Sequence, residues 1–323
     1  MFRKKELSLS SKGKTGTLFT IPVIVSLIIL GIILFCSVFA PLISPYDPYV
    51  QDMGATLSGP TSAHVAGTDS VGRDILTRLF YGGRTTIFGG LAIVFLCIVI
   101  GVPVGLVCGY YGGKTDAFFM RICDIILSFP SLLLAFVLVA GLGRNMSNAI
   151  LALGIVYIPG IARLVRSLTM VEKNKLYVEA LHSMCYSDIR IMFVHIIPNC
   201  VSSVIVQLTL NLGYAILDLA GMSFLGFGVQ APTADWGNML NEGRSYLMQN
   251  PLLALLPGLC IILLVVAINI FSDGLYRYLE PRQRKLPSFR KYDRAYERRV
   301  RKLEAQKAKN QDVNGRSQSC QHS

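Results

Sequence analysis

The side chains that most often do chemistry do not gather into a catalytic or metal-binding pattern in this sequence. The chain contains no G-x-x-x-x-G-K-[ST] phosphate loop, no H-E-x-x-H motif and no G-x-S-x-G nucleophile elbow. Its four histidines are scattered, and its eight cysteines form no C-x-x-C pair. Five of them lie in apolar runs: Cys36, Cys97, Cys108, Cys123 and Cys260. We therefore expect a protein that is not an enzyme, binds no metal and carries no cofactor of its own.

The segment most informative about function is instead residues 177–199, YVEALHSMCYSDIRIMFVHIIPN. The first half is typical of a short helix that carries Glu179, Ala180 and Ser183 along one side. Ser187 and Asp188 can cap a second helix, so the segment predicts a helix-turn-helix element. Both helices also carry apolar residues: Ala180, Leu181, Met184, Ile191, Met192 and Phe193. Because a purely solvated connector would not carry apolar faces, we expect a docking surface for another protein.

The chain that holds this element is too apolar for a soluble domain. Of 323 residues, 52% are hydrophobic and 15% are charged, and the mean hydropathy is +0.51, whereas soluble domains have about 25% charged residues. The apolar residues form blocks of roughly 20 residues or more, enough for a helix to cross about 30 Å of hydrocarbon. We predict an all-α, polytopic membrane protein with six transmembrane helices, at residues 21–43, 85–109, 119–142, 149–165, 197–227 and 252–275.

Lysine and arginine predict the orientation of these helices. Of the 31 basic residues, 26 fall in the two tails, the turn after the second span and the segment after the fourth span. The opposite side holds the remaining five: Arg73, Arg78, Arg84, Arg144 and Arg244. By the positive-inside rule both termini are cytoplasmic. The net charge of +12 is therefore mostly a matter of topology, and we expect no nucleic-acid partner.

The composition divides the chain into five parts. We expect a cytoplasmic N-terminal tail (1–20), a first transmembrane helix (21–43), an extracellular loop (44–84), a five-helix core (85–280) with a cytoplasmic loop at 176–198, and a basic cytoplasmic tail (281–323). Within that tail, residues 289–309 mix helix formers with charges of both signs, which predicts a solvated helix.

The segment at 177–199 resembles the EAA loop of binding-protein-dependent ABC importers. That signature has E-A-A, three residues, G, nine residues and I-x-L-P. Glu179 and Ala180 match it, Leu181 stands at the second Ala, Cys185 at the Gly, His195 at the Ile, and Ile197 with Pro198 at the L-P. The resemblance implies that this loop docks the ATP-binding subunit. The residues that it implies in ATPase coupling are Glu179, Ala180, Leu181, Ser183, Cys185, Asp188 and Pro198.

Three further stretches are similar to the second permease of dipeptide, oligopeptide and nickel importers. They lie at residues 67–86, 109–136 and 222–244, and with the EAA-like loop the resemblance covers about residues 20–285. It implies an ABC permease core in a prokaryotic plasma membrane, surrounded by lipid. It also implies four partner subunits: a second homologous permease, two cytoplasmic ATPases that use ATP and Mg, and an extracellular solute-binding protein. The transported solute would be a peptide or, alternatively, a nickel or other metal chelate.

Ionisable groups inside the predicted spans are the other candidates for function, because each is costly in hydrocarbon unless it faces protein or water. Arg121 and Asp124 can pair with each other or with a neighbouring helix. Asp218 lies deep in the fifth span, which is long enough to tilt or break near Gly213 or Gly221. Two interpretations of Asp218 remain open, namely a residue lining the transport pathway and a hydrogen bond between helices.

The outer segments carry candidate contacts with the solute-binding protein. The resemblance implies such contacts for outer loops, and we assign them to Asp69, Arg73, Asp74 and Trp236. Trp236 has a second interpretation, because the only tryptophan of the chain suits an anchor at the lipid headgroups.

Two other classes of protein compete with an ATP-driven permease. A secondary transporter would work without ATPase partners, but the sequence shows no inverted repeats. A membrane-embedded enzyme would need a convergent nucleophile, base or metal set, which the sequence also lacks.

Overall fold

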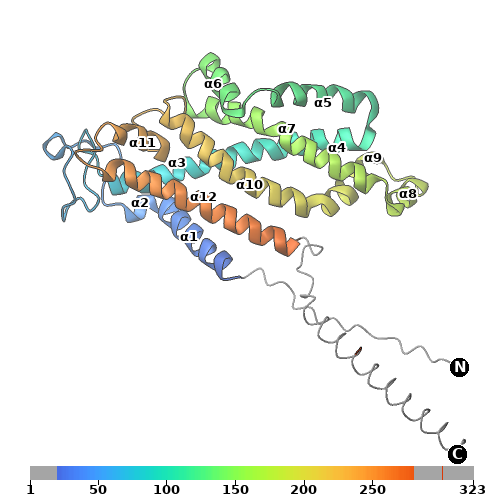
Figure 1. Ribbon diagram of the computed structural model, residues 1–323, viewed down its shortest axis with the longest axis horizontal. Coiled ribbons are helices and arrows are strands. Elements are labelled where there is room, and N and C mark those ends of the chain that lie inside the picture. The colour runs from blue at the N-terminus through green and yellow to red at the C-terminus, as the bar shows by residue number, and fades with distance from the viewer. Residues whose placement is uncertain (1–19, 280–299, 301–323) are drawn as a thin grey trace, which may run out of the picture. The chain divides into compact units, whose positions relative to one another are not determined.

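The computed structural model describes residues 20–279 and residue 300, and in that part of the chain every regular element is helical (Figure 1). The one β-type pairing there is an isolated bridge between Thr68 and Asp74. The elements are α1 (Ile21–Val38), α2 (Ala40–Ile43), η1 (Met53–Ala55), α3 (Ile75–Leu96), the π-helical η2 (Cys97–Gly101), α4 (Val102–Tyr111), α5 (Gly113–Leu127), α6 (Ser131–Leu142), α7 (Met146–Lys173), α8 (Leu176–Ser183), α9 (Asp188–Arg190), the π-helical η3 (Ile191–Ile196), α10 (Ile197–Phe224), α11 (Trp236–Arg244) and α12 (Leu252–Leu279). The helix predicted at residues 289–309 lies outside the described residues.

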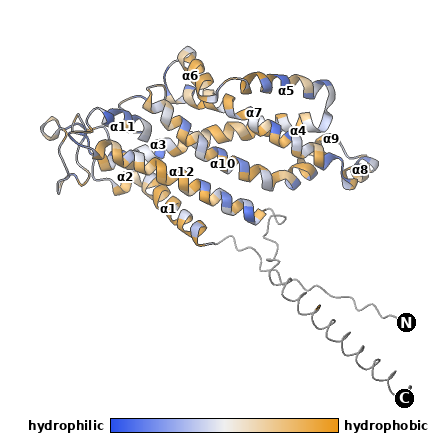
Figure 2. Ribbon diagram, viewed as in Figure 1, coloured by the Kyte–Doolittle hydropathy of each residue, from blue (hydrophilic) through white to orange (hydrophobic). Residues whose placement is uncertain are grey.

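Five helices in the described part are long and apolar enough to cross a membrane, and a bent helix pair makes a sixth span if it is counted as one. The five are α1, the continuous run from α3 to α4, α7, the run from α9 to α10, and α12. Apolar residues cover most of their length in Figure 2. The all-α, multi-span class predicted from composition is confirmed.

The third predicted span is not one straight helix. We predicted a continuous helix over residues 119–142, but α5 and α6 meet at an angle of 92°. Pro130 stands directly before α6, where its ring excludes the helical backbone of the preceding residue and removes one amide donor. α5 therefore runs beside α7 and α6 lies at a steep angle to α5, while both helices contact α7 (Figure 1).

The second and fifth spans also differ from the prediction. We placed the start of the second span at residue 85 and left the preceding residues in the outer loop, but α3 begins at Ile75. Asp74 caps it by accepting a hydrogen bond from the Thr77 amide at 2.8 Å. The fifth span does not break at Gly213 or Gly221; α10 is continuous through both and is preceded by the π-helical turn η3.

Glycines set a close helix contact between α4 and α7. Gly101, Gly105 and Gly109 are spaced four residues apart, so they lie on one face of the helix. A Cβ atom at Gly105 would lie 2.4 Å from the Ala162 carbonyl oxygen, and one at Gly109 would lie 2.7 Å from that of Arg166. Small residues at such spacing let two transmembrane backbones approach closely. The backbones of α4 and α7 are therefore packed closely against each other along this face.

Three apolar clusters fill the protein. One joins α4, α7, α8, η3 and α10 at the end of the molecule that carries α8. A second joins α3, α10, α11 and α12 at the opposite end, and a third packs α6 against α3, α7 and α10. The two ends of the bundle thus have separate cores, one packed against α8 and the other against α11.

Candidate functional site: the α8–α9 hairpin

The predicted helix-turn-helix element is present at residues 176–190, and we call it the α8–α9 hairpin. It consists of α8, a four-residue turn and α9, which runs directly into η3 and α10. In Figure 1 it forms the tip of the bundle, at the ends of α4 and α7. The hairpin is therefore the short segment that connects two long spans, α7 and α10.

The turn of the hairpin requires a left-handed residue, and Cys185 supplies it with φ of +56°. The Cys185 amide donates to the His182 carbonyl at 2.9 Å and the Tyr186 amide donates to the Leu181 carbonyl at 3.1 Å. These two bonds form a Schellman motif, whose left-handed position is most often glycine. The glycine of the EAA signature thus stands where this backbone needs one, and Cys185 adopts the same conformation with strain.

We expect Cys185→Gly to stabilise the protein by about 1 kcal/mol, because a left-handed conformation costs a non-glycine residue roughly that amount. Cys185→Val should destabilise it, since β-branched residues tolerate positive φ poorly. Melting temperatures of the purified subunit in detergent test both changes. Ser187→Gly is the matched control, because Ser187 has an extended backbone with φ of −68° and gains nothing from glycine. Equal melting temperatures for Cys185→Gly and Ser187→Gly would contradict the expectation.

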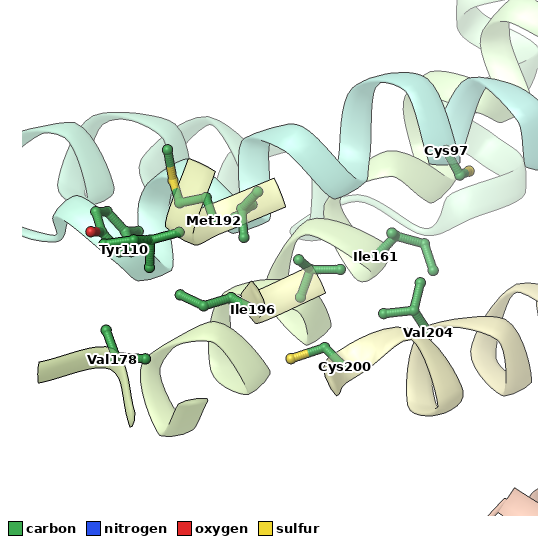
Figure 3. Packing of buried hydrophobic residues seen from close by; sticks show 11 residues of the cluster. Cys97, Tyr110, Ile161, Val178, Met192, Ile196, Cys200 and Val204 are labelled. Carbon is green, nitrogen blue, oxygen red and sulfur yellow. The ribbon is translucent and has the colours of Figure 1, made fainter. Parts of the chain in front are cut away.

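The inner face of the hairpin is packed on the membrane helices. Val178 is buried, and Tyr177 and Leu181 contact the same apolar cluster. Figure 3 shows Val178 beside Tyr110, Ile196 and Met192, which come from α4 and η3. The inner face of α8 is therefore in contact with the same apolar cluster as α4, α7 and α10.

Polar contacts reinforce this packing at the tip of α4. The Tyr110 hydroxyl donates to Asp188 at 2.8 Å and lies 3.2 Å from Nε2 of His182, so both helices of the hairpin bind one side chain. The Lys173 ammonium donates to the Tyr110 carbonyl at 2.5 Å. We call Tyr110, Lys173, His182 and Asp188 the hairpin clamp. Sequence reasoning identified Asp188 but missed Tyr110 and Lys173. Nothing in their own segments indicates a distant partner, and the two partners of Tyr110 lie 72 and 78 residues away along the chain.

A second group of contacts fixes the start of α8. Glu172 at the end of α7 forms an ion pair with Lys175 and accepts a hydrogen bond from the Tyr177 hydroxyl at 3.0 Å. Asn199 of α10 donates to the same hydroxyl at 3.1 Å. Burial raises the pKa of Tyr177, so the phenol stays protonated and able to donate.

The outer face of the hairpin is exposed and carries both apolar and polar side chains. Among the residues assigned to ATPase coupling, five are exposed: Glu179, Ala180, Ser183, Cys185 and Pro198. Leu181 and Asp188 are half-buried. Leu181 packs against the apolar cluster on the inner face, and Asp188 binds the Tyr110 hydroxyl. Leu176, Met184 and Ile189 expose 82%, 65% and 67% of their surface. Large apolar side chains exposed close to an exposed acid are typical of a protein interface.

The opposite end of the bundle contains a buried charge cluster. Asp69 binds Arg73 at 2.6 Å and lies 3.6 Å from Arg78, while Glu242 of α11 binds Arg73 at 3.1 Å and Arg78 at 3.2 Å. We call Asp69, Arg73, Arg78 and Glu242 the outer charge cluster. It joins the outer loop and α3 to α11, and its two positive and two negative charges balance.

The side chains assigned to the solute-binding protein are buried in this chain. Asp69, Arg73 and Asp74 are each at most 5% exposed, and Asp74 caps α3 and contacts His64. Trp236 is 2% exposed and donates its indole N–H to the Leu79 carbonyl at 2.8 Å. The interpretation of Trp236 as a headgroup anchor is wrong, because its ring lies between α3 and α10. A contact of this region with a binding protein stays a prediction, and exposed neighbours would have to make it.

Asp235, next to Trp236, ties the same elements together. It accepts hydrogen bonds from the Thr86 hydroxyl of α3 at 2.7 Å and from the Asn238 amide of α11 at 3.2 Å. Its complete burial raises the pKa of the carboxyl, since charge is disfavoured away from water. Asp235 is therefore the deeply buried N-cap residue of α11, a role that the sequence analysis did not assign.

Comparison with known proteins agrees with this arrangement. Residues 101–285 match the family described as "Binding-protein-dependent transport system inner membrane component", and residues 22–60 match the "N-terminal TM domain of oligopeptide transport permease C". The chain belongs to this permease family. It is a multi-pass subunit of the inner membrane and of an ABC importer, and the members of its family are permeases, not enzymes.

Curated relatives are similar over most of their length. The dipeptide transport system permease protein DppC of Haemophilus influenzae is 41% identical over 265 residues, which cover 80% of this chain and 90% of that protein. The glutathione transport system permease protein GsiD of Pectobacterium atrosepticum is 42% identical over 245 residues, covering 76% and 81%. The methionine ABC transporter MetNI in an inward-facing conformation shares the fold, with a TM-score of 0.51, 21% identity and coverage of 62% of this chain and 96% of that one.

The remaining candidate residues of the permease lie within its spans. Asp124 pairs with Arg163 of α7, so of the two partners considered for it the structure shows a neighbouring helix and not Arg121. Asp116 forms a second ion pair with Arg166 of the same helix at 2.5 Å. Asp218 accepts a hydrogen bond from the Tyr157 hydroxyl of α7 at 2.7 Å, as one of the two interpretations requires.

Proposed function

We propose that this permease subunit forms, with a second homologous permease, the pathway of an ATP-driven importer that carries peptides into the cell. The relatives named above, whose own names specify dipeptides and glutathione, favour peptides. A nickel or other metal chelate is the alternative cargo of the same architecture. Within the described residues no group of three or more His, Cys, Asp or Glu side chains could hold a metal ion.

The observation that carries the proposal is the α8–α9 hairpin. It presents exposed apolar side chains around Glu179 and Ala180, and its inner face is fixed to α4, α7 and α10. A cytoplasmic ATPase docked on that outer face would move the hairpin when it closes on ATP and Mg. Because the base is rigid, the membrane helices would follow and switch between inward-open and outward-open states.

The partners follow from this mechanism. Two ATPases supply the energy, one for each permease, and an extracellular solute-binding protein delivers the peptide to the outer end of the bundle. This chain then needs no cofactor of its own. A secondary transporter, the competing class, would transport without either partner.

Reconstitution tests the proposed function. Liposomes with the two permeases, two ATPases and binding protein from the same system should accumulate labelled dialanine only with ATP and Mg. Omission of the ATPases should stop uptake. Uptake driven by an ion gradient without ATP would support a secondary transporter instead, and selective accumulation of a nickel chelate would establish the alternative cargo.

We further propose that both tails and the hairpin are cytoplasmic and that residues 44–74 are external. An impermeant maleimide should label Ser62→Cys in intact cells but label Ser183→Cys only after permeabilisation. Both positions are exposed in the subunit. The background chain has Cys185→Ser and Cys320→Ser, which remove the exposed cysteine of the turn and the one in the C-terminal tail. The reverse labelling pattern would overturn the orientation and with it the importing direction.

A further inference from the structure

Four polar side chains form one stripe along the transmembrane helix α10. Gln207, Asn211, Tyr214 and Asp218 follow the spacing of four, three and four residues, which places them within a narrow arc of the helix surface. They lie in a span whose other residues are mostly apolar. Polar groups at membrane depth persist where they face protein or a water-filled space. The stripe therefore marks one side of α10 as different from its lipid-facing side.

A cavity of about 320 Å³ lies beside this stripe. Gln207 and Asn211 contribute its α10 wall, Tyr157 and Gly160 belong to the α7 wall, and Phe129 and Ser131 flank the break between α5 and α6. The volume is at the lower end of the range for small-molecule sites. The 92° bend of the broken pair is what brings the α5–α6 junction to this place.

Some donors and acceptors of the stripe make no hydrogen bond within the described residues. Gln207 donates to Asn211 at 3.0 Å, which leaves the Asn211 amide donors and the Gln207 carbonyl without a partner among the described residues. Asp218 receives its hydrogen bond from Tyr157, which itself lines the cavity. In that same part of the chain Asp218 has no cationic partner, in contrast to Asp116 and Asp124.

We propose that this face is a recognition site for the peptide in transit. The amides of Gln207 and Asn211 match the N–H and C=O groups of a peptide main chain, and the Asp218 carboxylate matches a protonated amino terminus. Tyr157 holds that carboxylate in position. The inference rests on the proposed function and goes beyond it, because it assigns the contact to named side chains and requires a free amino group on the cargo.

A purely structural role makes a different prediction. Asparagine has nearly the shape of aspartate and can still accept a hydrogen bond from Tyr157, so a packing contact would survive Asp218→Asn. A carboxylate that attracts an ammonium group in a low-dielectric space would not be replaced by a neutral amide. The charge, not the hydrogen bond, separates the two roles.

The test is uptake of labelled dialanine by the complete importer in proteoliposomes with saturating binding protein. We expect Asp218→Asn to lower the transport rate about tenfold or more, since about 1.4 kcal/mol of lost attraction is tenfold, and Asp218→Glu to recover much of it. Complex yield and ATP hydrolysis without peptide should not change. Thr209→Ala is the matched control, because Thr209 lies on the opposite side of α10 and its hydroxyl bonds only to the Ile205 carbonyl of its own helix.

Filling the cavity provides a second test. A Cβ atom at Gly160 would meet nothing within 4 Å, so the subunit has room for a side chain there. Gly160→Phe should assemble but transport poorly. Gly141→Phe is the matched control, because a Cβ atom at Gly141 of α6 also meets nothing within 4 Å and Gly141 does not line the cavity, so this variant should transport normally.

Unchanged uptake in Asp218→Asn and Gly160→Phe would overturn the recognition site, and so would loss of complex yield in Asp218→Asn, which would make the acid structural. If the unaltered complex accumulates no dialanine at all, the proposed function fails and not only this site.

Discussion

Ala180→Arg is expected to abolish ATP-driven uptake while the subunit still inserts in the membrane. Ala180 is exposed on the outer face of α8, beside Glu179 and one turn from Met184. A bulky cation at the centre of a packed interface removes apolar contacts and leaves a charge to be buried. We expect a loss of about 2 kcal/mol or more of binding free energy to the ATPase, the size of an interface hot spot, which weakens docking by more than about tenfold.

Glu179→Lys should also weaken ATPase docking and uptake, but by less than Ala180→Arg. The position keeps a long charged side chain, and only the sign of its charge reverses. Co-purification of the ATPase with the tagged permease measures docking, and uptake in proteoliposomes measures coupling.

Ala63→Arg is the control, since it adds the same side chain to an exposed position of the outer loop. Normal co-purification and normal uptake in both α8 variants would disprove docking through this face, whereas loss of docking in Ala63→Arg as well would indicate a general defect.

The transmembrane helices were predictable from apolar runs, but their ends and breaks were not. The start of α3 was missed by ten residues because Thr77 and Arg78 lower the hydropathy of its first turns. Both side chains are buried against other parts of the protein, so they do not face lipid. A hydropathy pattern records composition and cannot distinguish a polar residue facing water from one facing a protein partner.

The break in the third span had a local signal that the hydropathy pattern hid. The sequence SFPS at residues 128–131 interrupts an apolar run without lowering its mean hydropathy much. Proline restricts the residue before it and removes an amide donor, which favours a bend. Its size, 92°, depends on the packing of α6 on α7 and could not be read from the sequence.

The α8–α9 hairpin was predicted well because its determinants are local. Short-range apolar spacing and the motif position of Cys185 both lie within residues 176–198. The predicted side-chain capping was wrong in detail, because Ser187 is the N-cap residue of α9 but makes no capping hydrogen bond with its side chain, and Asp188 binds Tyr110 instead. The hairpin clamp was not predicted, since Tyr110 reaches His182 and Asp188 across 72 and 78 residues. Distance along the chain also explains the wrong assignment of Arg73. We assigned its side chain to a partner protein, but it binds Glu242, which is 169 residues away.

Arg78→Met should destabilise the outer end of the permease by about 3–5 kcal/mol, the usual cost of removing one member of a buried ionic group. Arg78 is 1% exposed, and its guanidinium contacts Glu242, Asp69 and the Pro232 carbonyl. Without it, Asp69 and Glu242 share one cation, Arg73, and the cluster keeps an unbalanced negative charge away from water. Methionine fills much of the volume, so the loss arises from charge and not from a cavity.

Arg84→Met is the matched control on the same helix, because Arg84 is exposed and should change stability by about 0.5 kcal/mol or less. Trp236, the single tryptophan of the chain, is buried between α3 and α10 and reports unfolding of this end by fluorescence. Adding Glu242→Gln to Arg78→Met should recover part of the lost melting temperature, since it removes the excess negative charge. Equal melting temperatures for Arg78→Met and Arg84→Met would mean that the cluster contributes no net stability. A double variant less stable than Arg78→Met would assign the loss to hydrogen bonds of Glu242, such as the one from Asn238 at 3.1 Å, and not to charge balance.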